Sequence, residues 1–554
     1  MNLTPFRSVV LMVFLLGAAT WPLLGQVSLA DGVKRHLDKL TEDQLPGMAV
    51  LIARDGKIAF QGGFGFADLD QKIRVTAETK FRIGSVTKQF TAAAILRLAA
   101  DGKLALTDTL QKFYPGFPRA DVVTLHHLLT HTSGIHSYTN KPEFMGRVTQ
   151  PIPPPELIAW FRDDPADFAP GAGFAYNNSG YFLLGSIVAQ VTGKSFDAYL
   201  RETFFAPLGM KNTGVFSNAH PPEGVARGYT VEGDKATPAL DWDMSWAGGA
   251  GALYSTVGDL FLWTEALFAG RVVPTECLKR MTTPVTLPPG VDGMNYGYGL
   301  MMASIKRLPA IAHGGGLNGW SSSLVRLPEQ NCTVAVLANA MPPAAGRSPD
   351  GVAQNLAAKF LEADIAKLPP IREDAAVDKK SYAEFAGRYD YKGAVITVTA
   401  EGERLFAQLT GQPRFEIFPS APDAFFLKVV DAQMVFQRNE QRAVVAVQHS
   451  QGGSSFRAPR VTTAEIKFTP AELDAILGQY QYGPTALMTI SRDGDSVFAQ
   501  LTGQPRFPIF PKSAVEFEWR VVAAKVSFVK DGTGKVTAAR HSQNGATFEA
   551  PKVK

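Results

Sequence analysis

The stretch GSVTK at residues 84–88, continued by QFTAAAILRLAA at residues 89–100, decides the fold prediction for this 554-residue chain. The alanine- and leucine-rich continuation predicts a helix that begins near Ser85 and stops at Gly102. Because residues three apart share one face of a helix, the Lys88 amine can reach the Ser85 hydroxyl. A serine hydroxyl needs an adjacent base to act as a nucleophile, and a lysine can serve once its pKa is lowered. The stretch therefore predicts a nucleophilic Ser85 activated by Lys88.

The S-x-x-K pattern alone has a simpler explanation. It fixes only two positions and occurs often by chance. In that alternative, Ser85 caps the helix and Lys88 is a solvated residue of its first turn. The motif therefore needs support from elsewhere in the chain.

A glycine-containing loop, PGAGFAYNNSGY at residues 170–181, carries the second group of candidate residues. Such a loop delivers side chains at fixed points. Tyr176 can relay a proton if a neighbouring cation lowers its pKa, and Asn178 can hold the lysine amine or a substrate carbonyl. The alternative is an ordinary turn before a predicted helix at residues 181–191.

The third group is HGGG at residues 313–316, just before the strand-like residues 321–327. Glycines let a substrate backbone approach a strand closely, and a free N–H there can complete an oxyanion hole. The alternative is a glycine hairpin or a bulge. Each alternative is reasonable alone, but three elements in this order favour a single active site.

The three motifs, together with three further stretches, resemble the β-lactamase-related serine hydrolases. That family includes class C β-lactamases, low-molecular-weight penicillin-binding proteins, D-aminopeptidases and related esterases. The further stretches are TLHHLLTHTSG at residues 124–134, LGM at 208–210 and AGGAGALYST at 247–256. The resemblance covers about 330 residues and implies an α/β (α+β) transpeptidase-like catalytic domain.

The resemblance also implies a role for each residue of the first two motifs. Ser85 would be the acylated nucleophile. Lys88 and Tyr176 would share the general base and acid work. Asn178 would orient the substrate and Lys88.

The third motif departs from the β-lactamase pattern. His313 stands where β-lactamases often have a lysine, in a Lys-Thr-Gly that suits a substrate carboxylate. The resemblance makes His313, Gly314, Gly315 and Gly316 substrate-binding, with the N–H groups of Gly316 and Ser85 forming the oxyanion hole. The loss of the lysine puts binding of a penicillin carboxylate in doubt and resembles the D-aminopeptidase branch.

We therefore expect a serine hydrolase that cleaves an amide or ester through an acyl-enzyme on Ser85, with a D-aminopeptidase-like activity favoured. An esterase and a β-lactamase or D,D-carboxypeptidase are the alternatives within this class. A different alternative is a catalytically silent penicillin-binding scaffold used for ligand binding. The presence of all four catalytic candidates argues against a silent scaffold.

The tail of the chain contains an internal repeat. FAQLTGQPRF at residues 406–415 recurs at 498–507, and HSQ at 449–451 recurs at 541–543. Short β-branched and aromatic runs separated by turn residues predict a small antiparallel β-barrel or sandwich in each copy. The D-aminopeptidase branch also carries two such barrels, and a barrel loop reaches its active site.

These patterns divide the chain into a catalytic domain at residues 31–366 and two barrel-like modules at 381–462 and 470–554. The repeated Gln-Pro-Arg, at residues 412–414 and 504–506, is interpreted as a turn shared by duplication. Whether either turn reaches the active site stays open at this point.

Residues 1–30 read as a signal peptide, which predicts a periplasmic or secreted protein. The alternative is an uncleaved anchor, but the apolar run from Val9 to Leu24 is shorter than the ~20 residues that span a bilayer. The two cysteines, Cys277 and Cys332, can pair in an exported protein or remain buried thiols.

The net charge of +4 is spread along the chain, which gives no electrostatic footprint for nucleic acid. We expect a small-molecule or peptide substrate, no cofactor, no membrane span after signal cleavage, and a homodimer as one possible assembly. His126, His127 and His131 have helix-like spacing but lack a suitably spaced acidic partner, so no metal is expected.

Three tryptophans could line a substrate groove: Trp242, Trp246 and Trp320. Packing in the core is at least as good an explanation for the first two. Trp320 is favoured for the groove because it closely follows the oxyanion strand.

Overall fold

The computed structural model describes most of the chain after residue 44. The described ranges are 45–233, 235–288, 291, 294–344, 346–374, 376–391, 394–410, 412–430, 432–451, 454–462, 468–483, 486–494, 496–502, 506–519, 524–543 and 546–553. The predicted signal peptide at residues 1–30 lies outside the described residues, as do Gln504 and Pro505 of the second Gln-Pro-Arg turn. No helix within the described ranges is long and apolar enough to cross a membrane.

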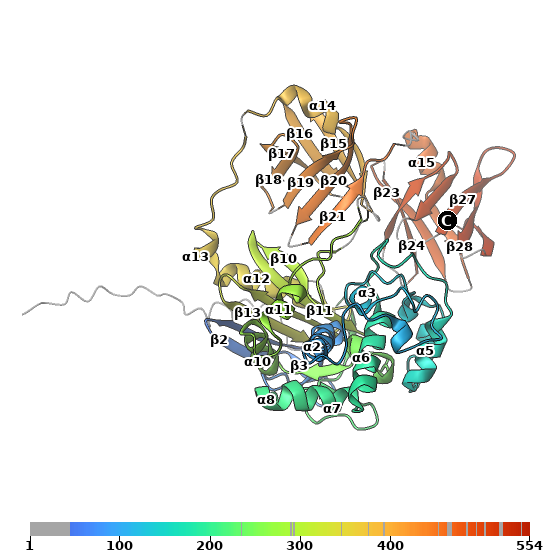
Figure 1. Ribbon diagram of the computed structural model, residues 1–554. Coiled ribbons are helices and arrows are strands. Elements are labelled where there is room, and N and C mark those ends of the chain that lie inside the picture. Colours follow the sequence, from blue (N-terminus) through green and yellow to red (C-terminus); the bar gives the residue numbers. More distant parts are fainter. Residues whose placement is uncertain are drawn as a thin grey trace, which may run out of the picture.

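A six-stranded antiparallel sheet forms the centre of the catalytic region (Figure 1). Its strand order is β10-β11-β12-β13-β1-β2, so the first two strands of the chain complete a sheet built mainly from residues after 300. Strands β1 and β2 are an antiparallel hairpin that turns at Asp55 and Gly56. The strands are β1 (Met48–Arg54), β2 (Lys57–Phe64), β10 (Met301–Ile305), β11 (Leu308–Leu317), β12 (Trp320–Leu327) and β13 (Cys332–Ala338).

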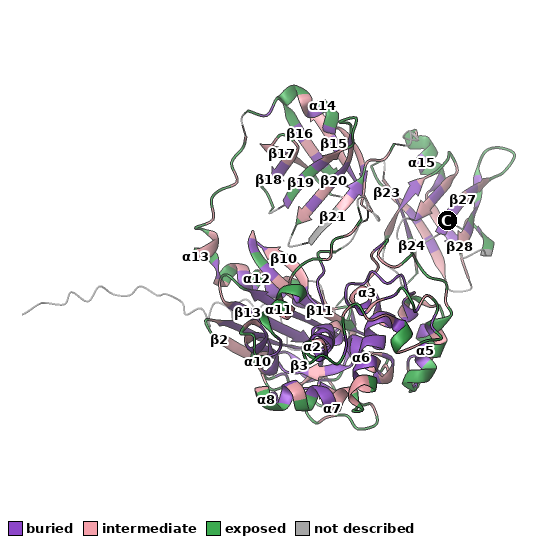
Figure 2. Ribbon diagram, viewed as in Figure 1, coloured by how far each residue is buried: buried purple, intermediate pink, exposed green. Residues whose placement is uncertain are grey.

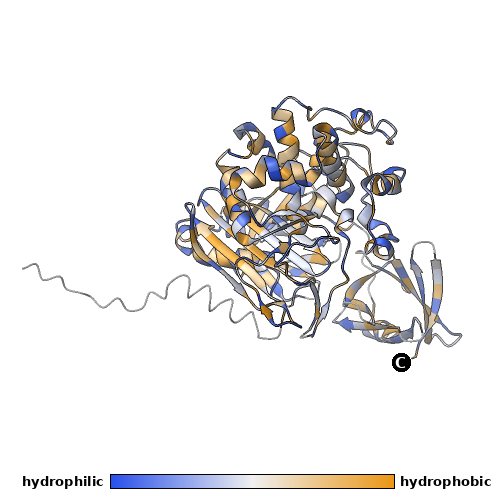
Figure 3. Ribbon diagram, turned by 90° about the horizontal axis from the view of Figure 1, so that it is seen from below, coloured by the Kyte–Doolittle hydropathy of each residue, from blue (hydrophilic) through white to orange (hydrophobic). Residues whose placement is uncertain are grey.

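Both faces of this sheet are covered by helices, because its central strands are apolar on both sides. Ala49 and Leu51 of β1 belong to the large core that faces the helical part, whereas Val50 and Ile52 belong to a second core on the opposite face. Helix α12 (Pro349–Phe360) closes that second core. Figure 2 shows α2 and β13 as largely buried, and Figure 3 shows apolar residues concentrated in the strands and helices of this region.

The helical part positions the candidate residues around α2 (Thr87–Ala100) and α6 (Asn178–Thr192). Helix α9 (Gly248–Gly251) packs closely on α6, because a Cβ added to Gly185 would lie 2.9 Å from the Cα of Gly249. This close approach brings the α9 backbone next to α2. Further helices are α3 (Leu125–Leu129), α5 (Pro154–Arg162), α7 (Phe196–Leu200), α10 (Val257–Phe268) and α11 (Thr275–Met281).

The tail folds into two antiparallel sheets of eight strands each, β14–β21 and β22–β29, which confirms the predicted pair of barrels. Isolated bridges between Tyr389 and Arg460 and between Tyr480 and Lys552 join the first and last strands of each sheet, so each is nearly closed. The first barrel comprises β14 (Gly387–Asp390), β15 (Val395–Glu401), β16 (Arg404–Leu409), β17 (Arg414–Ala421), β18 (Ala424–Leu427), β19 (Ala432–Arg438), β20 (Val444–Gln451) and β21 (Ser454–Pro459). The second comprises β22 (Gly478–Gln481), β23 (Leu487–Asp493), β24 (Ser496–Leu501), β25 (Phe507–Pro511), β26 (Glu516–Trp519), β27 (Ala524–Lys530), β28 (Val536–Gln543) and β29 (Ala546–Pro551).

The repeated motif has the same contacts in both barrels. In the first barrel the Arg414 guanidinium lies 3.8 Å from the Phe406 ring centroid and pairs with Glu401 at 2.7 Å. In the second, Arg506 lies 3.8 Å from the Phe498 ring centroid and pairs with Asp493 at 2.8 Å. These contacts favour a structural role for the repeated arginine within each barrel.

The two cysteines do not form a disulfide. Cys277 lies on α11 and is partly exposed, whereas Cys332 is buried in β13. The expectation of separate, buried thiols is therefore confirmed for Cys332, whereas Cys277 is a free thiol that is only partly buried.

Candidate active site

Ser85 and Lys88 meet at the start of α2. Ser85 lies in a 3-10 turn, η1 (Gly84–Val86), and does not cap either helix, because the capping positions are Ile83 and Val86. The Lys88 side chain is fully buried, and its Nζ lies 3.1 Å from Ser85 Oγ. The alternative of a helix cap beside a solvated lysine is therefore wrong.

Among its described contacts, the buried lysine amine has only uncharged partners. Its Nζ lies 2.8 Å from Asn178 Oδ1 and 2.8 Å from the Ala250 carbonyl oxygen, in addition to Ser85. Burial lowers the pKa of Lys88 well below its usual value. A neutral amine fits these contacts, because it can donate two N–H bonds to Asn178 and Ala250 and offer its lone pair to Ser85.

Tyr176 lies against the same pair. Its hydroxyl is hydrogen-bonded to Ser85, and its ring centroid is 4.8 Å from Lys88 Nζ. Burial raises the pKa of Tyr176 and outweighs the opposite effect of the Ser85 hydrogen bond. The expectation that a neighbouring cation lowers the pKa of this phenol is therefore wrong, because the lysine beside it is itself driven towards neutrality.

Asn178 is the first residue of α6, and Asn177 caps that helix by accepting a hydrogen bond from the Gly180 N–H. The Asn178 amide is fixed from both ends, because its Nδ2 donates to Thr139 Oγ1 at 3.1 Å while its Oδ1 accepts from Lys88. The loop therefore ends in a capped helix N-terminus that holds the Asn178 side chain in place, which an ordinary turn would not do.

The HGGG motif lies inside β11, so the alternatives of a hairpin or a bulge are wrong. Strand β10 pairs with β11 only as far as Ala312, which leaves the following residues without a strand neighbour on that side. There η1 packs against them: a Cβ on Gly84 would lie 2.9 Å from Gly316 N, and a Cβ on Gly315 only 2.0 Å from the Ile83 carbonyl oxygen. Glycine is therefore required where the nucleophile's turn meets the strand.

The four residues of this motif have different surroundings. Gly316 lines the cavity beside Ser85, whereas Gly315 faces Ile83. Gly314 faces the Asp350 carboxylate, 3.4 Å from where its Cβ would be. The prediction of a substrate-binding role is thus supported by position for Gly316 more than for the two glycines before it.

His313 is buried behind the cavity. Its Nδ1–H donates to the Gly314 carbonyl oxygen at 2.6 Å, so its Nε2 accepts from the Tyr296 hydroxyl at 2.9 Å. Burial, with a contribution from Lys88, lowers the pKa of His313 to about 3. His313 is therefore neutral and does not replace the positive charge of a lysine.

A small cavity of about 60 Å³ opens beside Ser85. Its aromatic wall includes Trp242 and Trp246, whereas Trp320 packs on the Arg82 guanidinium at 4.3 Å. The preference for Trp320 as a groove residue was therefore wrong. The described residues that line this cavity all precede the first barrel: Ser85, Tyr138, Thr139, Phe144, Asn178, Trp242, Asp243, Met244, Trp246, Ala247, Ala250, Gly251, Gly316 and Leu317.

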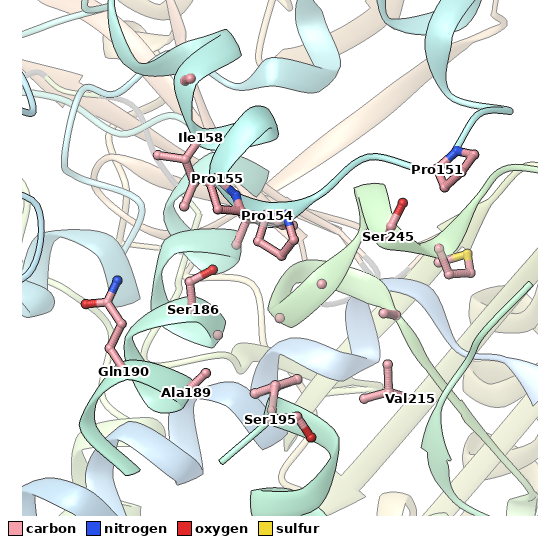
Figure 4. A pocket seen from close by; sticks show the side chains of 18 of the residues that line it. Pro151, Pro154, Pro155, Ile158, Ser186, Ala189, Gln190, Ser195, Val215 and Ser245 are labelled. Atoms are coloured by element: carbon pink, nitrogen blue, oxygen red, sulfur yellow. The ribbon is translucent and has the colours of Figure 1, made fainter. Parts of the chain in front are cut away.

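A larger cavity, of about 920 Å³, lies elsewhere, between α5, α6 and the start of α7 (Figure 4). Figure 4 shows Pro154, Pro155 and Ile158 of α5 opposite Ser186 and Ala189 of α6. This cavity lacks the Ser85–Lys88 pair, so it is not the site of the expected chemistry.

The histidines considered as metal ligands do not form a cluster. Helix α3 ends at Leu129, so His131 is not on the same helix as His126 and His127. Within the described ranges, no group of three or more His, Cys, Asp or Glu side chains is arranged to hold a metal ion.

Two parts of the site were not predicted. The Ala250 carbonyl is a backbone group, and no side-chain pattern reports where a carbonyl points. His131 was considered only as a metal ligand, although it contacts the Tyr176 ring. The sequence feature that could have indicated this role is the position of His131 in the TLHHLLTHTSG stretch, which resembles the family.

Comparison with known proteins agrees with this architecture. The family model described as Beta-lactamase matches residues 33–359. The chain belongs to the beta-lactamase family. A second model, described as a domain of unknown function (DUF3471), matches residues 372–470.

Several named proteins and solved structures are similar to this chain. Penicillin-binding protein 4* of Bacillus subtilis is 27% identical over 452 residues, which are 76% of this chain and 97% of that protein. A penicillin-binding protein homologue from Pyrococcus abyssi, whose structure is octameric, is 27% identical with a TM-score of 0.53, covering 77% of this chain and 99% of that one. A D-amino acid amidase from Ochrobactrum anthropi is 26% identical with a TM-score of 0.54, covering 61% and 99%.

Proposed function

We propose that this protein is a serine hydrolase that forms an acyl-enzyme on Ser85 and cleaves amides, with D-aminoacyl amides and D-residue peptides as its substrate class. The observation that carries the proposal is the fully buried Lys88 amine, 3.1 Å from Ser85 Oγ. Burial without a carboxylate partner favours the neutral form of an amine, in which it can act as a base, whereas a solvated lysine is protonated at neutral pH.

The proposed reaction begins when neutral Lys88 takes the Ser85 proton as Oγ attacks the substrate carbonyl carbon. The resulting oxyanion would accept hydrogen bonds from the backbone N–H groups of Ser85 and Gly316. Tyr176, whose raised pKa keeps it protonated, would give its proton to the leaving nitrogen and recover one from Lys88. Water then hydrolyses the ester on Ser85 by the same route in reverse.

Two observations support an amide with a D-residue over a penicillin. The neutral His313 provides no cation for a substrate carboxylate. The D-amino acid amidase is among the similar structures. Export to the periplasm or the medium, which the signal-like residues 1–30 suggest, is part of the same proposal.

Labelling with a fluorophosphonate probe tests the mechanism. We expect one adduct, mapped to Ser85 by mass spectrometry, and no adduct in the Ser85→Ala variant. An adduct elsewhere, or undiminished labelling of Ser85→Ala, would contradict the proposed nucleophile. Absence of labelling by both the fluorophosphonate and a labelled penicillin would favour the silent scaffold.

A substrate panel tests the specificity. D- and L-phenylalanine amide, p-nitrophenyl acetate and nitrocefin separate an amidase from an esterase and a β-lactamase. We expect D-phenylalanine amide to be the best substrate of the four. Turnover of nitrocefin alone would overturn the inference from His313.

A further inference from the structure

We propose that His131 is a positioning residue that holds Tyr176 against Ser85 and Lys88. This inference rests on the proposed function, because it assigns His131 a role in forming the acyl-enzyme. It is carried by three observations: backbone hydrogen bonds on both sides of Tyr176, ring contacts with Tyr176, and an unfavourable local arrangement at His131 itself.

The hydrogen bonds of His131 bracket Tyr176 in the sequence. The His131 carbonyl oxygen accepts from the Ala175 N–H at 3.0 Å, and its Nδ1 accepts from the Asn177 N–H at 3.0 Å. The next residue, Thr132, accepts from the Gly171 N–H at 2.8 Å. The backbone on either side of the tyrosine is therefore tied to His131, in a loop that would otherwise depend on its own turns.

The imidazole ring also lies on the tyrosine ring. The centroids of His131 and Tyr176 are 4.4 Å apart, with 40° between the ring planes. Tyr296 and Tyr181 lie on the same imidazole at 4.5 Å and 5.1 Å, so His131 sits at the centre of an aromatic cluster. Lys88 also contacts the Tyr176 ring. A displacement of His131 would therefore displace Tyr176, which in turn contacts Ser85 and Lys88.

His131 occupies this place at an energetic cost. Its φ angle is +61°, in the left-handed region that is uncommon for residues other than glycine, although histidine, like asparagine and aspartate, is found there more often than most. Because Nδ1 accepts a hydrogen bond, the proton of the neutral ring is on Nε2. That nitrogen is buried and has no hydrogen-bond partner among the described residues. A buried, unsatisfied donor at a strained position is expected to serve a site more than general stability.

Two substitutions separate the hydrogen bond from the ring. His131→Asn keeps a side chain that tolerates positive φ, and its Oδ1 can accept from the Asn177 N–H, but the ring contact is lost. His131→Gly tolerates the same φ and loses both. We expect the rate of D-phenylalanine amide hydrolysis, in which Tyr176 protonates the leaving nitrogen, to fall ~10- to 100-fold in His131→Gly, with partial recovery in His131→Asn, because misplacing a reacting group by about 1 Å costs on the order of 100-fold.

A double-mutant cycle with Tyr176→Phe decides whether His131 acts through the tyrosine hydroxyl. If it does, the His131 substitutions change the residual rate of D-phenylalanine amide hydrolysis less than ~2-fold in the Tyr176→Phe background. Equal fold-losses in both backgrounds, or undiminished hydrolysis in His131→Gly, would overturn the proposal. His220→Asn, at an exposed histidine, is the matched control, and melting temperatures confirm that each variant is folded during the assay. Failure of the wild-type protein to label at Ser85 would instead overturn the proposed function.

Discussion

At the scale of single residues, the protonation of Lys88 controls the proposed chemistry. The amine is surrounded by an amide oxygen, a carbonyl oxygen, a hydroxyl and two aromatic rings. None of these groups carries a negative charge in the resting site, so no described carboxylate offsets the cost of burying an ammonium ion. The site therefore holds Lys88 ready to accept a proton and Tyr176 ready to donate one.

The pH dependence of acylation tests this assignment. A general base works in its neutral form, so the rate rises with pH through the pKa of Lys88 and then levels off. Because that pKa is well below the usual 10.5, we expect the plateau to begin well below pH 10.5 in a profile of fluorophosphonate labelling. The Lys88→Met variant should lose ~10²- to 10⁴-fold in rate. A profile that still rises up to pH 10.5 would contradict a neutral buried amine.

At the scale of elements, the contact between η1 and β11 fixes the distance between the nucleophile and the oxyanion strand. Gly84 and Gly315 allow this contact because neither carries a Cβ that would meet the opposing backbone. The close packing of α9 on α6 likewise fixes the position of the Ala250 carbonyl oxygen that binds Lys88. The geometry of the site therefore depends on small residues where elements meet.

Alanine substitutions in β11 test this view. Gly315→Ala places a methyl group 2.0 Å from the Ile83 carbonyl oxygen, so the strand must move away from η1. We expect a loss of ~1–3 kcal/mol in the free energy of unfolding, measured by urea denaturation, and a marked loss of Ser85 labelling. Gly316→Ala is the matched control for stability, because its methyl group meets only the Met341 side chain, at 3.3 Å. Equal stability of the two variants would argue against a tight contact.

At the scale of the whole molecule, the chain consists of a catalytic region and two barrels with separate hydrophobic cores. The two cores of the catalytic region do not include any residue of the barrels among their described members, and each barrel has a core of its own. Units with separate cores can fold independently. Assembly as a homodimer stays a prediction.

Removal of both barrels tests this independence. A chain ending after Pro370 keeps Leu368, which packs against the second core of the catalytic region. We expect it to fold and to label at Ser85 within ~3-fold of the full-length rate, because the described lining of the catalytic cavity includes no barrel residue. Circular dichroism and the labelling rate provide the measurements. A folded fragment that no longer labels would show that a barrel contributes to the site.

The sequence by itself determined the order of the three motifs, the β-lactamase-like fold, the paired barrels and the identity of Ser85, Lys88, Tyr176 and Asn178 as neighbours. The paired barrels follow from a repeat that can be read directly, whereas the fold and the grouping of these residues follow from the resemblance of the three motifs to the family. The residues meet as expected because the family pattern fixes their elements.

Only the tertiary structure decided the electrostatics and the supporting contacts. Burial raised the pKa of Tyr176 and kept His313 neutral, and neither effect can be read from neighbours in the sequence. The Ala250 carbonyl reached Lys88, and His131 reached Tyr176, through packing between elements far apart along the chain. Local patterns predict the helix, strand or loop on which a residue lies. The protonation and the partners of its side chain depend on what the rest of the fold places around it.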